Sequence, residues 1–167
     1  SQQHYPDLCT SLVRGTGIDP ELRDSGLLIL APDEIAQAQA WALQHQHIVQ
    51  LIDSVTFHTL EPAAAQAPDN ALWMPKIQQL RNPRLVRALR KQVQQLGIQL
   101  LSNTPVTHID CHDAHCQGIR TAQTKIQADT VVVCAGAWSG QLLTPFGLPP
   151  AIHPVRGQML LFKTPPG

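Results

Sequence analysis

Apolar residues recur at every third or fourth position between residues 83 and 96, and this spacing predicts an amphipathic helix. Asn82 can cap its first turn, Pro83 suits the first helical position, and Gly97 is a typical helix stop. The apolar stripe consists of Leu85, Leu89, Val93 and Leu96. Weaker patterns of the same period predict three further helices, at residues 2–14, 32–46 and 138–143.

Short apolar runs between turn residues predict strands along most of the chain. These runs occupy residues 27–30, 71–75, 98–101, 104–110, 118–121, 131–134 and 159–162. Residues 49–60 contain shorter strand-like pieces. Because helical and strand patterns are interspersed without an internal repeat, we expect an α/β (α+β) fold with at least one mixed sheet.

The most informative of these runs covers residues 131–134 and ends at the small residues Ala135, Gly136 and Ala137. We expect a buried strand there, because a short continuous apolar run is typical of one. Small residues at the end of a strand let a backbone or a ligand come close. In α/β sheets the carboxyl edge of such a strand is where cofactors bind. The three small residues are therefore candidate cofactor-binding residues, and close packing of a helix on the strand is the alternative explanation.

The composition excludes several classes of partner. The 167 residues include 12 Lys and Arg against 12 Asp and Glu, so no net charge attracts nucleic acid or an anionic membrane. No apolar stretch approaches the ~18 residues of a membrane span, and no signal-peptide pattern is present. Four irregularly spaced cysteines do not suggest a secreted disulfide framework. We expect a cytoplasmic protein with reduced thiols, in which Cys9 and Cys134 are buried as small apolar residues.

The segment from His108 to Cys116 contains three histidines and two cysteines, which are ligands that zinc prefers. The sequence predicts a hairpin with Asp113 at its tip, and alternation would send the side chains to both faces of the strands. Chance placement of surface residues is therefore the simpler explanation, and a zinc-stabilised, non-enzymatic interaction domain is the alternative. The chain has no Gly-x-Ser-x-Gly motif, so hydrolase chemistry lacks support.

Short motifs in a fixed order carry a family resemblance. They lie at residues 81–85 (Arg-Asn-Pro-Arg-Leu), 104–106 (Thr-Pro-Val), 135–139 (Ala-Gly-Ala-Trp-Ser) and 154–158 (Pro-Val-Arg-Gly-Gln). This order resembles the FAD-dependent D-amino acid oxidase family, above all its bacterial glycine oxidase branch, which is linked to thiazole and thiamine biosynthesis. The Gly-x-Gly-x-x-Gly motif with which family members begin is missing here. The resemblance implies an internal fragment of a two-lobed flavoprotein, without the substrate-clamping arginine and tyrosine of the family.

The resemblance also implies where the cofactor lies. The backbone amide and carbonyl of Val106 would contact the adenine of FAD, and Ala135, Gly136 and Ala137 would pass near the dinucleotide. No residue of the chain matches a catalytic position. The implied division is residues 1–80 in the substrate-side lobe, 81–145 in an internal part of the FAD-binding lobe, and 146–167 in a return strand of the substrate lobe.

The implied reaction is oxidative deamination of a small amino acid such as glycine to an imine, with dioxygen reoxidising FAD and hydrogen peroxide as product. The isolated chain is expected to be inactive and to lack FAD. Sarcosine oxidase and D-amino acid dehydrogenase types are alternatives within the family. Sheet edges opened at the ends of a fragment could pair between chains, so a homo-oligomer is an open alternative.

Overall fold

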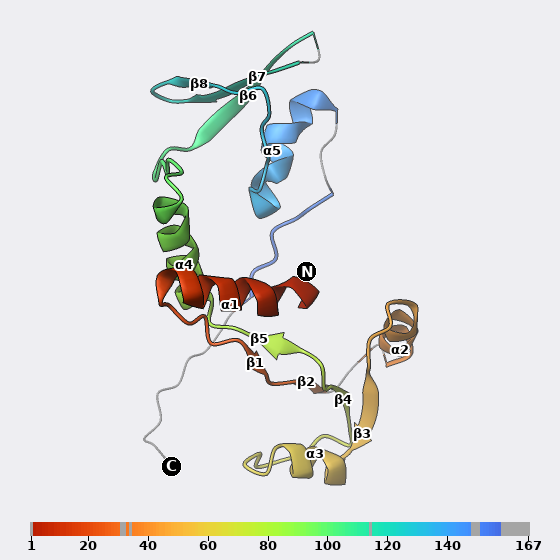
Figure 1. Ribbon diagram of the computed structural model, residues 1–167. Helices are drawn as coiled ribbons and strands as arrows, with labels where there is room; N and C mark the ends of the chain where they lie inside the picture. Colours follow the sequence, from red (N-terminus) through yellow and green to blue (C-terminus); the bar gives the residue numbers. More distant parts are fainter. Residues whose placement is uncertain (1, 31–32, 34, 114, 148–150, 158–167) are drawn as a thin grey trace. The chain divides into compact units, whose positions relative to one another are not determined.

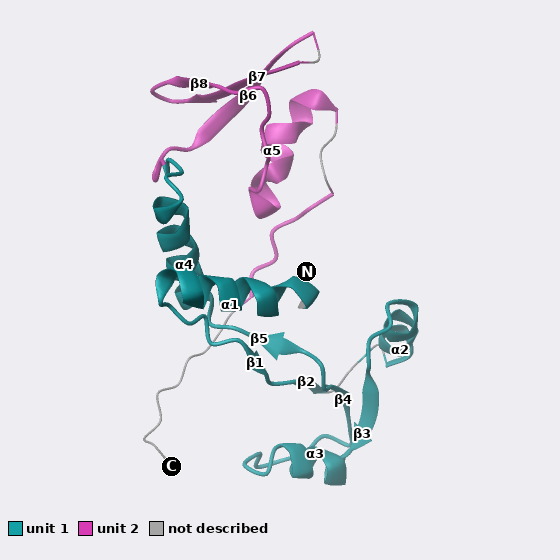
Figure 2. Cartoon of the chain, in the orientation of Figure 1, with its two compact units in different colours: residues 1–100 teal, residues 101–167 magenta. Residues whose placement is uncertain are grey.

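The computed structural model describes residues 2–30, 33, 35–113, 115–147 and 151–157. The chain divides into two compact units, unit 1 at residues 1–100 and unit 2 at residues 101–167 (Figure 2). The elements of unit 1 are η1 (Gln2–His4), α1 (Tyr5–Thr16), β1 (Arg23–Asp24), β2 (Leu27–Leu30), α2 (Ile35–Gln44), β3 (Gln50–Asp53), α3 (Ser54–Leu60), β4 (Asn70–Met74), β5 (Gln78–Gln79) and α4 (Asn82–Gln95) (Figure 1). Those of unit 2 are β6 (Val106–His112), β7 (His115–Thr121), β8 (Lys125–Gln127), η2 (Gly136–Trp138), α5 (Ser139–Leu143) and η3 (Thr144–Phe146).

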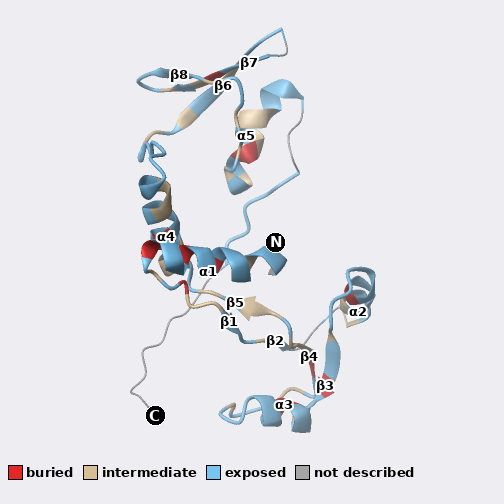
Figure 3. Cartoon of the chain, viewed as in Figure 1, coloured by how far each residue is buried: buried red, intermediate tan, exposed pale blue. Residues whose placement is uncertain are grey.

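The interspersed helices and strands confirm the α/β (α+β) class. All strand pairs among the described residues are antiparallel, so the parallel pairing of a mixed sheet is not seen among them. Most buried residues of unit 1 fall into two small groups, the first where α3 meets β3 and β4 and the second at the contact of α1 with α4 (Figure 3). None of the helices in the described part is long and apolar enough to cross a membrane.

The first of these groups lies beside the three-stranded sheet of unit 1, whose strand order is β2-β4-β3. Its core consists of Ile52, Phe57 and Ala71, and Ile52 lies directly opposite Ala71 in the sheet. The neighbouring pair, Leu28 and Trp73, is partly buried against this core. Alternation along the strands therefore gives the sheet one apolar face for the aromatic ring of Phe57.

Residues 54–60 form a helix, α3, so the expectation of strand-like pieces there is wrong. The cause is local: the Asp53 carboxylate accepts a hydrogen bond from the backbone N–H of Thr56 at 2.8 Å. Such a cap satisfies one of the free donors of a first helical turn. The same hydrogen bond lowers the pKa of the Asp53 carboxyl below its usual range.

The second group joins the two longer helices of unit 1. Residues Cys9 and Leu12 of α1 are buried, and so is Ala88 of α4, which is fully covered. The ammonium group of Lys91 donates a hydrogen bond to the carbonyl of Thr16 at 2.7 Å, so a charged side chain of α4 closes the end of α1. The helix predicted from the apolar stripe is confirmed, although its N-cap residue is not Asn82 but the residue before it.

Unit 2 is built on the three-stranded sheet β6-β7-β8. Gly118 lies buried at the middle of this sheet with φ of +127°. A Cβ atom at this position would overlap the backbone carbonyl of Ile126 and lie 2.9 Å from Cα of Gln127. Only glycine fits so close an approach of β7 to β8 at a positive φ.

A carboxylate on the edge strand β6 links the three strands of the sheet through ion pairs. Asp110 of β6 lies 2.8 Å from Nε of Arg120 in β7 and 3.0 Å from Nζ of Lys125 in β8. The Asp110 side chain is only 13% exposed. The hydrogen bond from Arg120, followed by that from Lys125, lowers the pKa of the Asp110 carboxyl.

The prediction of a buried strand at residues 131–134 is wrong. Val132 is 79% exposed and Cys134 is exposed, whereas Cys9 is buried as expected. The backbone groups of residues 131–134 make no hydrogen bond to another described residue. An apolar run forms a strand only beside a neighbour that completes its ladder, and the β6-β7-β8 sheet does not extend to it. Residues 98–101 likewise form no strand, and the strand expected at 159–162 lies outside the described residues.

Candidate functional site

Unit 2 contains a cavity of about 630 Å³. Its walls come from β6, β7, the segment that follows β8, η2 and α5. The lining residues are Val106, Thr107, Ile109, Ile119, Val131, Val132, Val133, Cys134, Ala135, Trp138, Gln141 and Leu142. Most of these side chains are apolar, and among them are two of the four candidate cofactor residues, Val106 and Ala135. The fold thus brings together two positions that lie far apart in the sequence.

The other two candidate residues lie beside this cavity and do not line it. Gly136 is exposed with φ of +54°, and no atom lies within 4 Å of the place that its Cβ would occupy. Ala137 is half-buried in η2. The turn is closed by the backbone N–H of Trp138, which donates to the carbonyl of Ala135 at 3.1 Å. This turn carries the chain from the cavity wall into α5.

Sequence reasoning missed the residues that make the cavity floor. Ile109 of β6 and Ile119 of β7 are directly opposite one another in the sheet and both line the cavity. Leu142 of α5 also lines the cavity. Alternation along β6 was the available signal, because residues two apart share a face of a strand. That signal does not identify which face is covered by a later segment.

The cavity offers hydrogen-bonding groups from the backbone more than from side chains. β6 is an edge strand, so part of its backbone N–H and C=O groups face away from β7. Residues 131–134 present further backbone groups that no other described residue binds. Apolar walls combined with a few such polar groups are typical of small-molecule and cofactor sites. The lining therefore suits the adenine of FAD, the group that the family resemblance associates with Val106.

The same lining has little capacity for acid–base chemistry. Among the described residues that line it there is no carboxylate, histidine, lysine or arginine, and its one ionisable side chain is the thiol of Cys134. Asp110 is engaged with Arg120 and Lys125 and does not line the cavity. The arrangement can bind and orient an aromatic group, and a proton acceptor for a reaction would have to come from elsewhere.

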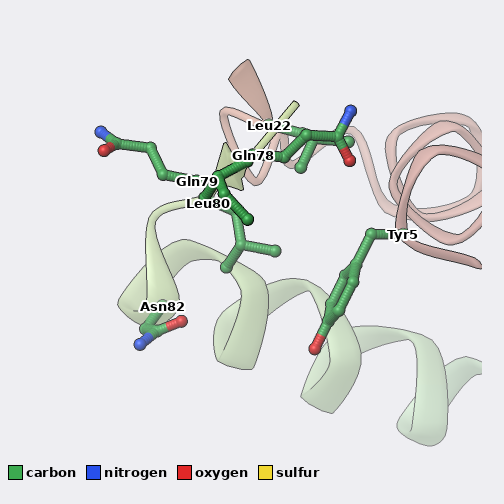
Figure 4. Close-up of a pocket in the computed structure, with 7 residues that line it drawn as sticks. Tyr5, Leu22, Gln78, Gln79, Leu80 and Asn82 are labelled. Atoms are coloured by element: carbon green, nitrogen blue, oxygen red, sulfur yellow. The ribbon is translucent and has the colours of Figure 1, made fainter. Parts of the chain in front are cut away.

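Unit 1 has a smaller cavity, of about 400 Å³. Figure 4 shows Tyr5 of α1 facing side chains from the β5–α4 segment. The remaining lining residues are Leu22, Ile77, Gln78, Gln79, Leu80 and Asn82. The side-chain amide of Gln78 donates a hydrogen bond to the Asp24 carboxylate at 2.7 Å, so one polar group of this cavity already has a protein partner. None of the candidate cofactor residues lies in this cavity.

The histidines and cysteines from His108 to Cys116 form the predicted hairpin of β6 and β7. They do not assemble into a metal centre: the described residues contain no group of three or more His, Cys, Asp or Glu that could hold a metal ion. The reason is the register. Cys111 is opposite Cys116 and His112 is opposite His115, so the two pairs point to opposite faces.

Comparison with known proteins identifies the family to which the chain is related. The chain matches the model of a family described as FAD dependent oxidoreductase over residues 2–167. Glycine oxidase from Pseudomonas putida is 37% identical over 164 residues, and glycine oxidase from Pseudomonas aeruginosa is 35% identical over the same length. Each alignment covers 98% of this chain and 45% of the relative.

A solved structure supports the same relationship. The crystal structure of glycine oxidase from Geobacillus kaustophilus matches with a TM-score of 0.72 at 27% identity, over 88% of this chain and 41% of that chain. The chain therefore spans less than half the length of the relatives that it matches. The match to the family model extends over nearly every residue of the sequence, so this chain belongs to the FAD dependent oxidoreductase family.

Proposed function

We propose that the full-length protein containing this chain is an FAD-dependent oxidase of a small amino acid, with glycine as the preferred candidate. The observation that carries the proposal is the 37% identity to a glycine oxidase over nearly the whole chain. The apolar cavity of unit 2 agrees with it, because Val106 and Ala135 share that cavity. When bound, FAD would supply the redox chemistry by accepting a hydride from the substrate.

In this proposal the residues of the chain bind and orient, and they do not react. The apolar side chains of Ile109 and Ile119 form a floor for the adenine ring, and backbone groups at Val106 recognise its edge. Gly136 leaves open space beside the cavity, where the dinucleotide continues past Ala135 and Ala137. Because the described residues of the lining include no lysine, arginine or histidine, the charge of a pyrophosphate would have to be neutralised by other parts of the protein.

The lobe assignment is part of the same proposal. Residues 1–80 would belong mainly to the substrate-side lobe, 81–145 to the FAD-binding lobe and 146–167 to a return strand of the substrate lobe. The compact units divide at residue 100, so α4, which this assignment places in the FAD-binding lobe, packs on α1 within unit 1. Limited proteolysis of the full-length holoprotein tests the assignment, because cleavage within a true lobe should be slower than cleavage between lobes.

The isolated chain, by this account, is inactive and does not retain FAD. The chain spans 45% of the length of that glycine oxidase, and the family resemblance places the dinucleotide motif and the substrate-clamping arginine and tyrosine outside it. Incubating the isolated chain with FAD and removing free cofactor by gel filtration tests this. Stable co-elution of flavin would contradict it.

Oxygen uptake by the purified full-length protein tests the proposed reaction. We expect glycine to be oxidised with one hydrogen peroxide formed for each dioxygen consumed, and sarcosine and D-alanine to be compared at equal concentration. Faster turnover of sarcosine would favour the sarcosine oxidase type. Substrate oxidation that needs an artificial electron acceptor and consumes no dioxygen would favour the D-amino acid dehydrogenase type and contradict the oxidase.

A further inference from the structure

The β6–β7 hairpin places two thiols opposite one another. Cys111 of β6 and Cys116 of β7 are directly paired in the antiparallel register, one position before the pair of His112 and His115 at the turn. Cys111 is exposed and Cys116 is half-buried, and both are free thiols. Because directly opposite residues share a face of the sheet, the two sulfurs lie on the same side.

The spacing of such a pair matches the reach of a disulfide. Directly opposite residues of antiparallel strands have Cα atoms about 4.5 or about 5.5 Å apart, and disulfides span roughly 4.4–6.8 Å between Cα atoms. For Cβ atoms the two ranges meet at about 4.5 Å. The register is shifted between Asp110 and Cys111, which leaves Gln117 as an extra residue. This bulge separates the end of the hairpin from the regular ladder, so a bond between the two cysteines can form at that end without displacing the rest of the sheet.

The two remaining cysteines have no such partner. Cys9 is buried in α1, and burial, followed by the negative charge of Asp19, raises the pKa of its thiol. Cys134 is exposed but belongs to the segment after β8, which pairs with no described strand. Only the hairpin cysteines therefore combine access to solvent with a second cysteine directly opposite in the register.

We propose that Cys111 and Cys116 form a peroxide-sensitive modification site that closes to a cross-strand disulfide. The thiolate of Cys111, the more exposed of the two, attacks one oxygen of hydrogen peroxide. The O–O bond breaks, the leaving hydroxide takes a proton to become water, and Cys111 carries a sulfenic acid. The thiolate of Cys116 then attacks that sulfur, the S–S bond forms, and the hydroxyl leaves as a second water. Overall, two thiols are oxidised by two electrons and one peroxide is reduced to two waters.

The source of the oxidant rests on the proposed function, because an amino acid oxidase releases hydrogen peroxide on every turnover. The site itself rests only on the hairpin register. It would record peroxide produced by the enzyme, and reducing agents would reset it. Substitution of either cysteine would remove the response.

The direct test uses the full-length protein and added hydrogen peroxide. After brief exposure, free thiols are blocked with iodoacetamide and the protein is digested without reduction for mass spectrometry. We expect a linked Cys111–Cys116 species that has lost two hydrogens and that dithiothreitol restores. Cys116→Ser should leave a sulfenic acid at Cys111 that dimedone traps, Cys111→Ser should lose the reaction, and Cys134→Ser is the matched control that should still form the link.

Several results would overturn the proposal. One is that both hairpin cysteines remain open to iodoacetamide after peroxide treatment. Another is separate oxidation of Cys111 and Cys116 to sulfinic acids without a link. A third is a link that forms as fast in protein unfolded by urea, because the strand register would then have no part in it.

A second arm separates this proposal from the proposed function. The full-length protein is incubated with glycine in air, with or without catalase, in place of added peroxide. A link that forms with glycine and is suppressed by catalase supports both proposals. A link that forms with added peroxide but never with glycine supports the thiol pair and contradicts glycine oxidation as its source of oxidant.

Discussion

Replacing Gly118 with alanine should open the sheet that carries the candidate cofactor cavity. The new Cβ would overlap the backbone carbonyl of Ile126, a rigid neighbour that cannot rotate away as a side chain does. Holding alanine at φ of +127° adds backbone strain of about 1–3 kcal/mol. Relief of the overlap costs roughly another 1–3 kcal/mol. The expected loss is therefore about 2–6 kcal/mol, a large share of the ~5–15 kcal/mol that stabilises a typical domain.

The matched control is Gly147→Ala in the same unit. Gly147 has φ of +71°, and no atom lies within 4 Å of the place that its Cβ would occupy. Alanine there meets strain of about 1–2 kcal/mol but no overlap. The difference between the two variants isolates the close approach of β7 to β8.

Hydrogen exchange read by mass spectrometry is the suitable assay, because global unfolding of a protein of several domains is not a two-state process. Peptides from β7 and β8 should exchange at least ~30-fold faster in Gly118→Ala, which corresponds to ~2 kcal/mol. Peptides from α1 and α4 should be unchanged, because those helices belong to the other unit. If Gly118→Ala protects β7 and β8 as well as Gly147→Ala does, the argument from the close approach is wrong.

Three further predictions concern single groups. A hydrogen bond from Arg120 lowers the pKa of the Asp110 carboxyl in the folded protein. The stabilisation by Asp110 is therefore complete above its unfolded pKa of about 3.9 and is lost as pH falls through the lower folded value. In that pH window, Asp110→Asn should remove the pH dependence of the protection of unit 2 against hydrogen exchange. Phe57 is 3% exposed, so Phe57→Ala should lower the free energy of local opening of α3, β3 and β4, read by hydrogen exchange, by about 3–5 kcal/mol. Val55→Ala, at a side chain 72% exposed, should stay within about 0.5 kcal/mol, and equal losses would contradict the core assignment. Iodoacetamide should label Cys134 well before Cys9, and equal labelling rates would place Cys9 outside the core.

The parts of the fold that the sequence predicted are those governed by local periodicity. α4 follows from an apolar stripe that ends at Gly97, and α1 follows from a weaker stripe that ends at Gly17, where φ is +71°. The β6–β7 hairpin follows from alternation around Asp113, whose positive φ of 48° suits a tight turn. In each case the signal lies within a few residues of the element that it describes.

The errors arose where the structure depends on distant contacts or on a single cap. Residues 54–60 are rich in residues that favour strands, yet the Asp53 cap begins a helix there. Residues 131–134 are as apolar as a buried strand, but no described strand pairs with them. Composition indicates that a segment favours burial, and it does not indicate which neighbour covers the segment.

The candidate site was predictable in part for the same reason. The pattern of small residues at 135–137 and the family resemblance of the motif at 104–106 each predict a cofactor-binding segment. Their meeting at one cavity, with Ile109 and Ile119 as its floor, is a property of the folded sheet. Sequence spacing carries no information about that meeting.

The visible absorption spectrum of the full-length protein, purified without added cofactor, tests the central claim most directly. The account predicts the bands of oxidised flavin, FAD as the compound released on denaturation, and bleaching of the bands when glycine is added without oxygen. Filling the cavity with Ala135→Trp should reduce the FAD retained, because the larger ring occupies the space beside Val106. A colourless protein that also fails to take up added FAD would contradict the account.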